Sequence, residues 1–115
     1  MKQFGLPKCC VLRKNGEFKR VYQAGRRLYG EGFAIIYLAN NLPQSRLGIS
    51  VQRKVGNAVR RNRIKRLVRE VFRLHRAEFP QQADIIITVR PGITINTTAD
   101  MYAAMGSVLL LSEKR

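Results

Sequence analysis

The fold is decided by residues 57–79, whose sequence is NAVRRNRIKRLVREVFRLHRAEF. The stretch contains no glycine or proline, and its apolar side chains recur every three or four residues, at Ile64, Leu67, Val68, Val71 and Phe72. That spacing predicts a long amphipathic helix with one apolar face for the core. Pro80 is expected to end the helix, because proline cannot continue the helical hydrogen-bond ladder.

The opposite face of this helix is basic. At about 100° per residue, one arc of roughly 100° holds Asn62, Lys65, Arg66, Arg69, Arg73 and Arg76, which we call the basic stripe. A solvated helix surface normally mixes charges of both signs, whereas Glu70 is the one acid among residues 53–76. Because most of these cations are arginines, whose planar fork suits phosphate oxygens, the stripe favours nucleic acid over lipid.

Composition supports one basic globular domain. The 115 residues carry a net charge of +15, and 45% of them are hydrophobic, enough for a core. Such a charge on a small domain indicates a polyanionic partner, with nucleic acid the first candidate and an anionic membrane surface the second. We expect a single domain over residues 1–115, with residues 1–11 extended or flexible.

The compartment is expected to be the cytoplasm. Cys9 and Cys10 are adjacent and cannot join distant parts of a fold, so they are interpreted as thiols in a reducing environment. The N-terminus lacks the apolar core of a signal peptide, and residues 101–112 are too short to span a bilayer.

The remaining elements follow from local patterns. Asn15 is a candidate N-cap and Gly25 a candidate left-handed stop for a short helix over residues 15–25. Thr97 and Asp100 resemble a capping pair before a last helix. Apolar β-rich runs predict strands at residues 33–38, 47–51 and 83–89, with a further strand near 28–32. This order predicts an α/β sandwich of the α+β kind.

The chain offers little for catalysis without a partner. Its seven acids form no close pair that would hold a divalent metal or divide acid and base roles. The single histidine, His75, falls on the apolar side of the main helix and is expected to pack there. We therefore predict no catalytic residue and no metal site in this chain.

Two aromatic residues leave a choice open. Phe18 and Tyr22 lie four residues apart on the first predicted helix, beside several cations. Aromatic rings next to cations can stack on unpaired bases. Ordinary core packing explains the same spacing equally well.

The segment VGNAVRRNRIKRLVR at residues 55–69, with RKNGEFKRVY at 13–22 and LGISVQRK at 47–54, closely resembles the bacterial ribonuclease P protein family. The resemblance extends from about Leu12 to Val89. It implies a mixed four-stranded sheet with three helices, like a domain of a ribosomal protein, with a left-handed βαβ crossover. It also implies a subunit that binds a catalytic RNA and precursor tRNA and assists removal of the 5′ leader.

The resemblance implies that Mg²⁺ is held mainly by the RNA, with no membrane and no obligate protein partner. It assigns leader binding to Phe18, Tyr22, Ser50 and, less directly, Tyr37, because the aromatic position of the family falls on Ile36. Together with the clustered charge, it assigns RNA binding to Arg53, Lys54, Asn57, Arg60, Arg61, Asn62, Arg63, Lys65, Arg66, Arg69 and Arg73.

Three other functions compete with this interpretation. A small structural RNA-binding protein of ribosomal type shares the charge and size, and only the motif context separates the two. A metal-dependent nuclease acting alone is disfavoured by the carboxylates. A DNA-architectural protein stays open, because phosphate contacts carry no sequence information.

Overall fold

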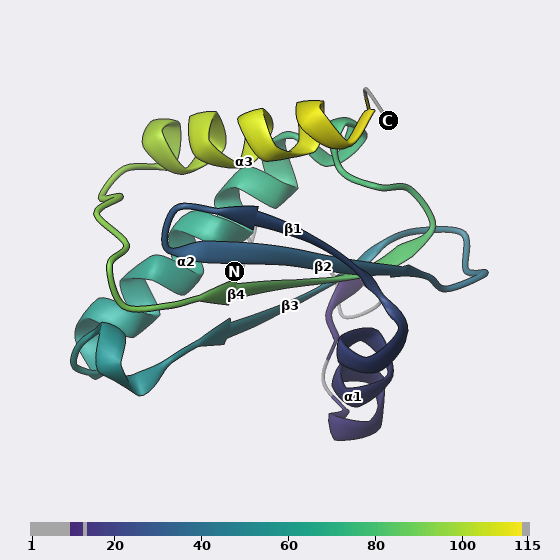
Figure 1. The fold of residues 1–115 in the computed structure, drawn as a ribbon, viewed down its shortest axis with the longest axis horizontal. Helices are drawn as coiled ribbons and strands as arrows, with labels where there is room; N and C mark the ends of the chain where they lie inside the picture. The colour runs from purple at the N-terminus through teal and green to yellow at the C-terminus, as the bar shows by residue number, and fades with distance from the viewer. Residues whose placement is uncertain (1–9, 13, 114–115) are drawn as a thin grey trace, which may run out of the picture.

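The computed structural model describes residues 10–12 and 14–113, and their order of elements confirms the predicted succession of helices and strands (Figure 1). These residues form α1 (Asn15–Ala24), β1 (Arg26–Gly30), β2 (Phe33–Ala39), β3 (Arg46–Val51), the short 3₁₀ helix η2 (Arg53–Val55), α2 (Ala58–Leu74), the 3₁₀ helix η3 (Arg76–Glu78), β4 (Ala83–Val89) and α3 (Thr98–Glu113). The strand expected near residues 28–32 is β1, which begins earlier, at Arg26.

The strands form one mixed sheet in the order β1-β2-β4-β3. Strand β2 pairs antiparallel with both β1 and β4, whereas β3 and β4 are parallel neighbours. Parallel neighbours need a crossover connection, which α2 supplies between β3 and β4. The predicted βαβ unit and the mixed four-stranded sheet are therefore confirmed.

The main core lies between one face of the sheet and helices α2 and α3. Helix α2 buries Ile64, Val68, Val71 and Phe72 there, while Leu67 is only half-buried. Helix α3 adds Met101 and Met105, and the strands add Phe33, Ile35, Leu47, Ile85, Ile87 and Val89. The apolar face that the spacing predicts thus packs against the sheet, and the basic face of α2 points outward.

Helix α1 packs against the other face of the sheet, as Figure 1 shows, and forms a smaller core with Val21, Ile36 and Ile86. Phe18 packs at its edge, directly over Gly48 of β3. A Cβ at residue 48 would lie 2.6 Å from Phe18 Cζ, so only glycine lets the ring approach the strand.

Both predicted ends of the first helix are wrong in detail. Lys14 occupies the N-cap position, and Glu17 accepts its backbone N–H at 3.2 Å, so Asn15 already lies inside the helix. Gly25 is extended, with φ −76° and ψ 160°, and is not left-handed. Glycine is needed there because a Cβ would lie 2.5 Å from the Val21 carbonyl oxygen.

Helix α2 ends before the predicted proline stop. It terminates at Leu74, and His75 leaves the helical region with φ −127° and ψ 36°. The chain then forms η3, after which Phe79 packs edge-on against Phe72 at 5.2 Å between ring centroids. The chain therefore turns earlier than the local sequence indicates, and the turn brings Phe79 onto Phe72. The predicted cap of α3 is confirmed, since Thr97 Oγ1 accepts the N–H of Asp100 at 3.1 Å.

Candidate nucleic-acid interface

The N-terminus of α2 is held by its own polar residues. Asn57 is the N-cap, and its Oδ1 accepts the N–H of Arg60 at 2.9 Å. The preceding η2 turn presents Arg53 and Lys54 as exposed side chains. Two cations predicted to bind RNA, Arg53 and Lys54, therefore lie beside the start of α2. The Asn57 side chain instead caps the helix.

Two arginines of the predicted set are directed toward the protein. Arg60 is half-buried and donates to the carbonyl oxygens of Val55 at 3.3 Å and Ile93 at 3.1 Å. Arg63 donates to the carbonyl oxygen of Asn96 at 3.2 Å. Both tie α2 to the segment that follows β4. Arg61 is partly exposed and Asn62 is exposed beside them.

The middle of the basic stripe is the part that is available to a ligand. Among the described residues, no acid forms an ion pair with Lys65, Arg66 or Arg69. Arg73 instead pairs with Glu70 at 2.7 Å, and this hydrogen bond lowers the pKa of Glu70.

Arg76 was expected on the basic face of α2, but α2 ends before it. It lies in η3 beyond the end of α2, with its guanidinium 5.8 Å from the centroid of the Phe72 ring.

The second surface lies between α1 and the sheet. The Tyr22 hydroxyl is 3.1 Å from Thr88 Oγ1 on β4, which places the ring against the sheet. Arg27 lies over the same ring at 5.8 Å and donates to the Tyr22 carbonyl oxygen at 2.7 Å. Ser50 is the register partner of Thr88 and shares its face. Phe18, Tyr22 and Ser50 therefore lie on the same face of the sheet, beside α1, and we call this surface the cleft.

Tyr37 does not belong to this cleft. It packs against the core under α2 and α3, whereas its neighbour Ile36 faces α1. Successive residues of a strand point to opposite faces, so a shift of one residue moves the side chain through the sheet. The expectation that Tyr37 lies with Phe18 and Tyr22 is therefore wrong, and the β2 residue on that face is the aliphatic Ile36.

One groove joins the two surfaces. It has a volume of about 120 Å³ and is lined by Phe18 of α1, by Gly48 and Ile49 of β3, and by Lys65 and Arg69 of α2. An aromatic ring thus meets, across the edge strand β3, two cations that pair with no acid among the described residues. A flexible anionic chain with planar groups could contact both in the same place.

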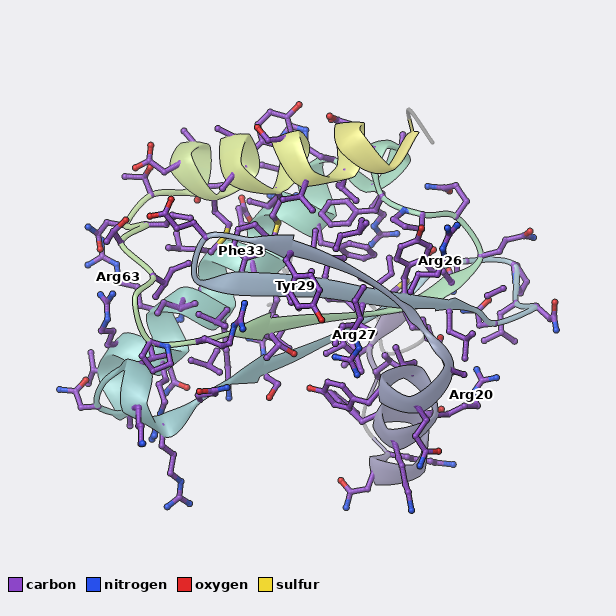
Figure 2. The ribbon with its side chains drawn as sticks, viewed as in Figure 1. Arg20, Arg26, Arg27, Tyr29, Phe33 and Arg63 are labelled. Atoms are coloured by element: carbon purple, nitrogen blue, oxygen red, sulfur yellow. The ribbon has the colours of Figure 1, made fainter. Side chains whose placement is uncertain are left out.

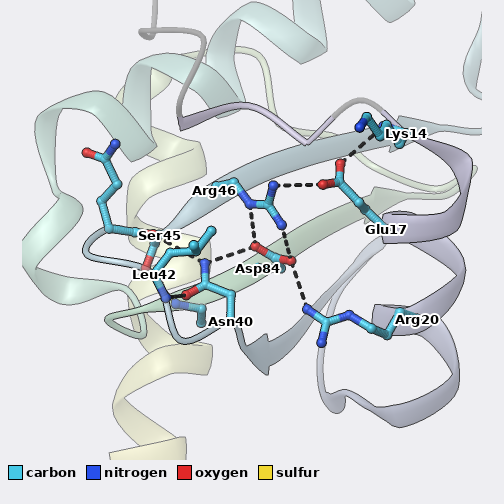
Figure 3. A network of polar contacts seen from close by, with 10 residues as sticks. Lys14, Glu17, Arg20, Asn40, Leu42, Ser45, Arg46 and Asp84 are labelled. Carbon is cyan, nitrogen blue, oxygen red and sulfur yellow. Dashed lines mark hydrogen bonds and ion pairs between the residues drawn. The ribbon is translucent and has the colours of Figure 1, made fainter.

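A buried carboxylate anchors α1 beside this cleft (Figure 3). Asp84 of β4 is fully buried and accepts two hydrogen bonds from Arg46, at 2.8 and 2.7 Å, and one from Arg20 of α1 at 3.2 Å. Arg46 also donates to Glu17 of α1 at 2.7 Å. The helix is therefore tied to the sheet at two residues one turn apart, which sets where Phe18 and Tyr22 lie.

The charge state of Asp84 follows from these contacts. Burial alone would raise its pKa, but the hydrogen bonds from Arg46 and Asn40 and the charge of Arg46 outweigh burial, so the pKa lies below its ordinary value. The same pair raises the pKa of Arg46, chiefly through its hydrogen bonds to Asp84. The network is a fixed ion cluster at neutral pH.

The described residues contain no group of three His, Cys, Asp or Glu side chains placed to hold a metal ion. His75 stacks on Tyr102 at 3.7 Å and lies 3.1 Å from Glu78 Oε2, an edge position in agreement with its predicted packing. The Tyr102 hydroxyl donates to Glu78, which raises the pKa of Tyr102. None of the helices in this part of the chain has the length and apolar character to cross a bilayer.

Sequence reasoning missed the residues that support the cleft. Gly48 carried a usable signal, since a glycine inside a strand often marks close approach of another group. Asp84 carried one too, because a carboxylate in an apolar strand must find cationic partners. Arg27 and Thr88 carried none, since their contacts with Tyr22 depend on strand register.

The chain is similar to proteins of one known family. The family model described as Ribonuclease P matches residues 6–111. The ribonuclease P protein component of Desulfotalea psychrophila is 53% identical over 108 residues, covering 94% of this chain and 90% of the relative. That of Syntrophus aciditrophicus is 41% identical over 113 residues, covering 98% and 94%.

Solved structures agree with these relatives. The RNase P protein of Staphylococcus aureus has a TM-score of 0.82 at 34% identity, covering 92% of this chain and 97% of that one. The Thermotoga maritima RNase P protein has a TM-score of 0.71 at 32% identity, covering 89% and 93%.

Proposed function

Because the chain belongs to the bacterial ribonuclease P protein family and is a protein subunit of that ribonuclease, we propose that its two surfaces bind two different RNAs. The basic stripe on α2 binds phosphates of the catalytic RNA, and the cleft under α1 binds the unpaired 5′ leader of precursor tRNA. The groove that Phe18 shares with Lys65 and Arg69 carries this proposal, because it brings stacking and phosphate-binding groups together.

The assignment of each surface rests on the chemistry of its side chains. Lys65, Arg66 and Arg69 offer cations without acidic partners among the described residues, which suits a backbone of phosphates. The cleft offers aromatic rings and hydroxyl groups, which suit bases that are not paired in a duplex. Arg60 and Arg63 are proposed to act mainly by holding the start of α2, so that Arg61 and Asn62 face the RNA.

Catalysis is proposed to use Mg²⁺ held mainly by the RNA subunit. Four acids have partners elsewhere, with Asp84 inside the ion cluster, Glu17 on Arg46, Glu70 on Arg73, and Glu78 beside His75 and Tyr102. The chain would then contribute positioning and charge neutralisation to hydrolysis at the mature tRNA 5′ end. We place this activity in the cytoplasm, with catalytic RNA and precursor tRNA as partners and no membrane or obligate protein partner.

The test compares binding of precursor and mature tRNA by the assembled holoenzyme. Stacking of a base on an aromatic ring contributes roughly 1–3 kcal/mol, so Phe18→Ala should weaken binding of precursor tRNA by about that amount. Binding of mature tRNA should change little, because it has no leader. Lys19→Ala, an exposed substitution on the same helix, is the matched control.

Thermal unfolding of each variant separates a binding effect from a folding effect, since Phe18 is half-buried. Equal losses for precursor and mature tRNA at retained stability would refute the leader assignment. Tyr22→Phe isolates the contribution of the hydroxyl that contacts Thr88.

A further inference from the structure

Tyr29 is an exposed aromatic residue that neither surface described above uses. It lies on the edge strand β1 with 63% of its surface accessible. A single exposed apolar side chain is ordinary in a folded protein. The position of this ring on the sheet is what distinguishes it.

The strand register places Tyr29 on the face of the sheet that carries the leader cleft. One row of register partners crosses all four strands as Tyr29, Ala34, Thr88 and Ser50. Thr88 contacts the Tyr22 hydroxyl from this face, and Ser50 borders the same cleft. In Figure 2, Tyr29 and Arg27 extend from β1 toward the side on which α1 lies.

Cations flank the ring as they flank the cleft. The Arg90 guanidinium lies 5.9 Å from the centroid of the Tyr29 ring, at the outer limit of a cation–π contact, and Arg27 lies 5.8 Å from that of Tyr22. The partner of Tyr29 on β2 is the small Ala34, so that partner leaves the ring uncovered. The same face of the sheet therefore carries, beyond Tyr22 and toward β1, a second aromatic ring with a cation beside it.

We propose that Tyr29 is a second base-stacking position, occupied by an unpaired nucleotide of the leader beyond the nucleotides held under α1. This rests on the proposed leader-binding function. Ser50 on β3 and Tyr29 on β1 are separated by three strand spacings, about 14 Å. That span exceeds the roughly 3.4 Å rise of one stacked nucleotide, so only a leader of several nucleotides reaches Tyr29.

RNA is favoured over other occupants by the charges around the ring. The neighbouring side chains Arg27 and Arg90 attract a phosphate backbone, and they disfavour a basic peptide. A lone tyrosine offers too little apolar surface for a membrane. Stacking on an exposed ring that also has the Arg90 guanidinium over it, 5.9 Å from its centroid, is an interaction by which single-stranded RNA is bound without a duplex.

The experiment measures affinity of the holoenzyme for precursor tRNAs whose leaders lengthen one nucleotide at a time. The variants are Tyr29→Ala and Tyr29→Phe, with Leu74→Ala as control, since Leu74 is an exposed apolar residue of α2, which packs on the other face. The wild type, the Tyr29→Phe variant and the control should gain affinity at an early leader length and again at a later one. Tyr29→Ala should lose only the later gain, about fivefold or more.

A Tyr29→Ala variant that keeps both gains would overturn the Tyr29 proposal and leave the leader cleft intact. An equal loss at every length, mature tRNA included, would also overturn it, because the ring would then contact another part of the complex. A wild type with no dependence on leader length would instead refute the leader function itself. A fluorescent base analogue at the later position should be quenched by wild type and Tyr29→Phe but not by Tyr29→Ala.

Discussion

Replacing Asp84 with asparagine tests whether the buried ion cluster holds α1 on the sheet. The substitution keeps the shape of the side chain and removes its charge. Asp84 accepts four hydrogen bonds, two from Arg46 and one each from Arg20 and Asn40, and its side chain is fully buried. In the variant, the two guanidinium groups would face a neutral amide that cannot accept at both of its atoms.

The expected cost follows from the surroundings of the two arginines. Removing one partner of a buried ion pair usually destabilises a protein by about 3–5 kcal/mol. Arg46 keeps Glu17, and the Arg20 side chain is 53% exposed and can return to water, so the lower end applies, about 3 kcal/mol. For a domain of this size that corresponds to a fall in Tm of about 10 °C.

The dependence on pH supplies a second readout. The pKa of Asp84 is lowered by folding, so its contribution is fully present above the unfolded value near 4 and disappears as the pH falls through the lower folded value. The gap in unfolding free energy between wild type and Asp84→Asn should therefore close only below about pH 4.

Thermal and urea unfolding, followed by circular dichroism across this pH range, measure that gap. Glu31→Gln is the control, because it removes the same charge from an exposed turn. A Tm within a degree or two of wild type at neutral pH, or a gap that persists unchanged in acid, would refute the anchoring role of Asp84.

Three further predictions concern the basic stripe and the division of labour. Arg69→Ala should weaken binding to the catalytic RNA at unchanged Tm and reduce the log–log salt slope by about 0.7–0.9, as filter binding over a salt series would measure; an unchanged slope would exclude a phosphate contact. Arg60→Met should cost roughly 1.5–3 kcal/mol in urea unfolding through lost hydrogen bonds to Val55 and Ile93, whereas Arg66→Met should cost little. The chain freed of RNA should not cleave precursor tRNA, and cleavage by the RNA-free chain would contradict the proposed division of labour. Adding the chain to catalytic RNA should lower the Mg²⁺ concentration needed for cleavage in single-turnover assays, because its +15 charge replaces part of the screening by ions.

Local patterns were sufficient to predict most elements and the basic stripe. The period of an α-helix is set by backbone geometry within a few residues, so the apolar and basic faces of α2 could be separated from spacing alone. Ile64 and Val68 are buried, and Arg66 and Arg69 are exposed, as that period requires. The end of α2 was misplaced because the helix ends at Leu74 and the chain enters η3, although no glycine or proline marks that point in residues 57–79.

The direction of individual side chains within the basic cluster was not predictable in the same way. Arg60 and Arg63 belong to the same run of cations as Arg66, yet both donate to carbonyl oxygens of residues that follow β4. Those acceptors lie more than thirty residues away in the chain. A spacing rule within one helix contains no information about them.

The cleft depended on strand register, which is a relation between distant segments. The sequence by itself predicted a basic domain with a polyanionic partner, nucleic acid first, and the candidate rings Phe18 and Tyr22. Tertiary structure decided that Tyr37 faces the core under α2 and that Tyr29 faces the cleft, because neighbouring residues of a strand point to opposite sides of the sheet. It also brought Arg20 and Arg46 to Asp84 from segments far apart in the chain, since a buried carboxylate is stable only where cations meet it in the folded state.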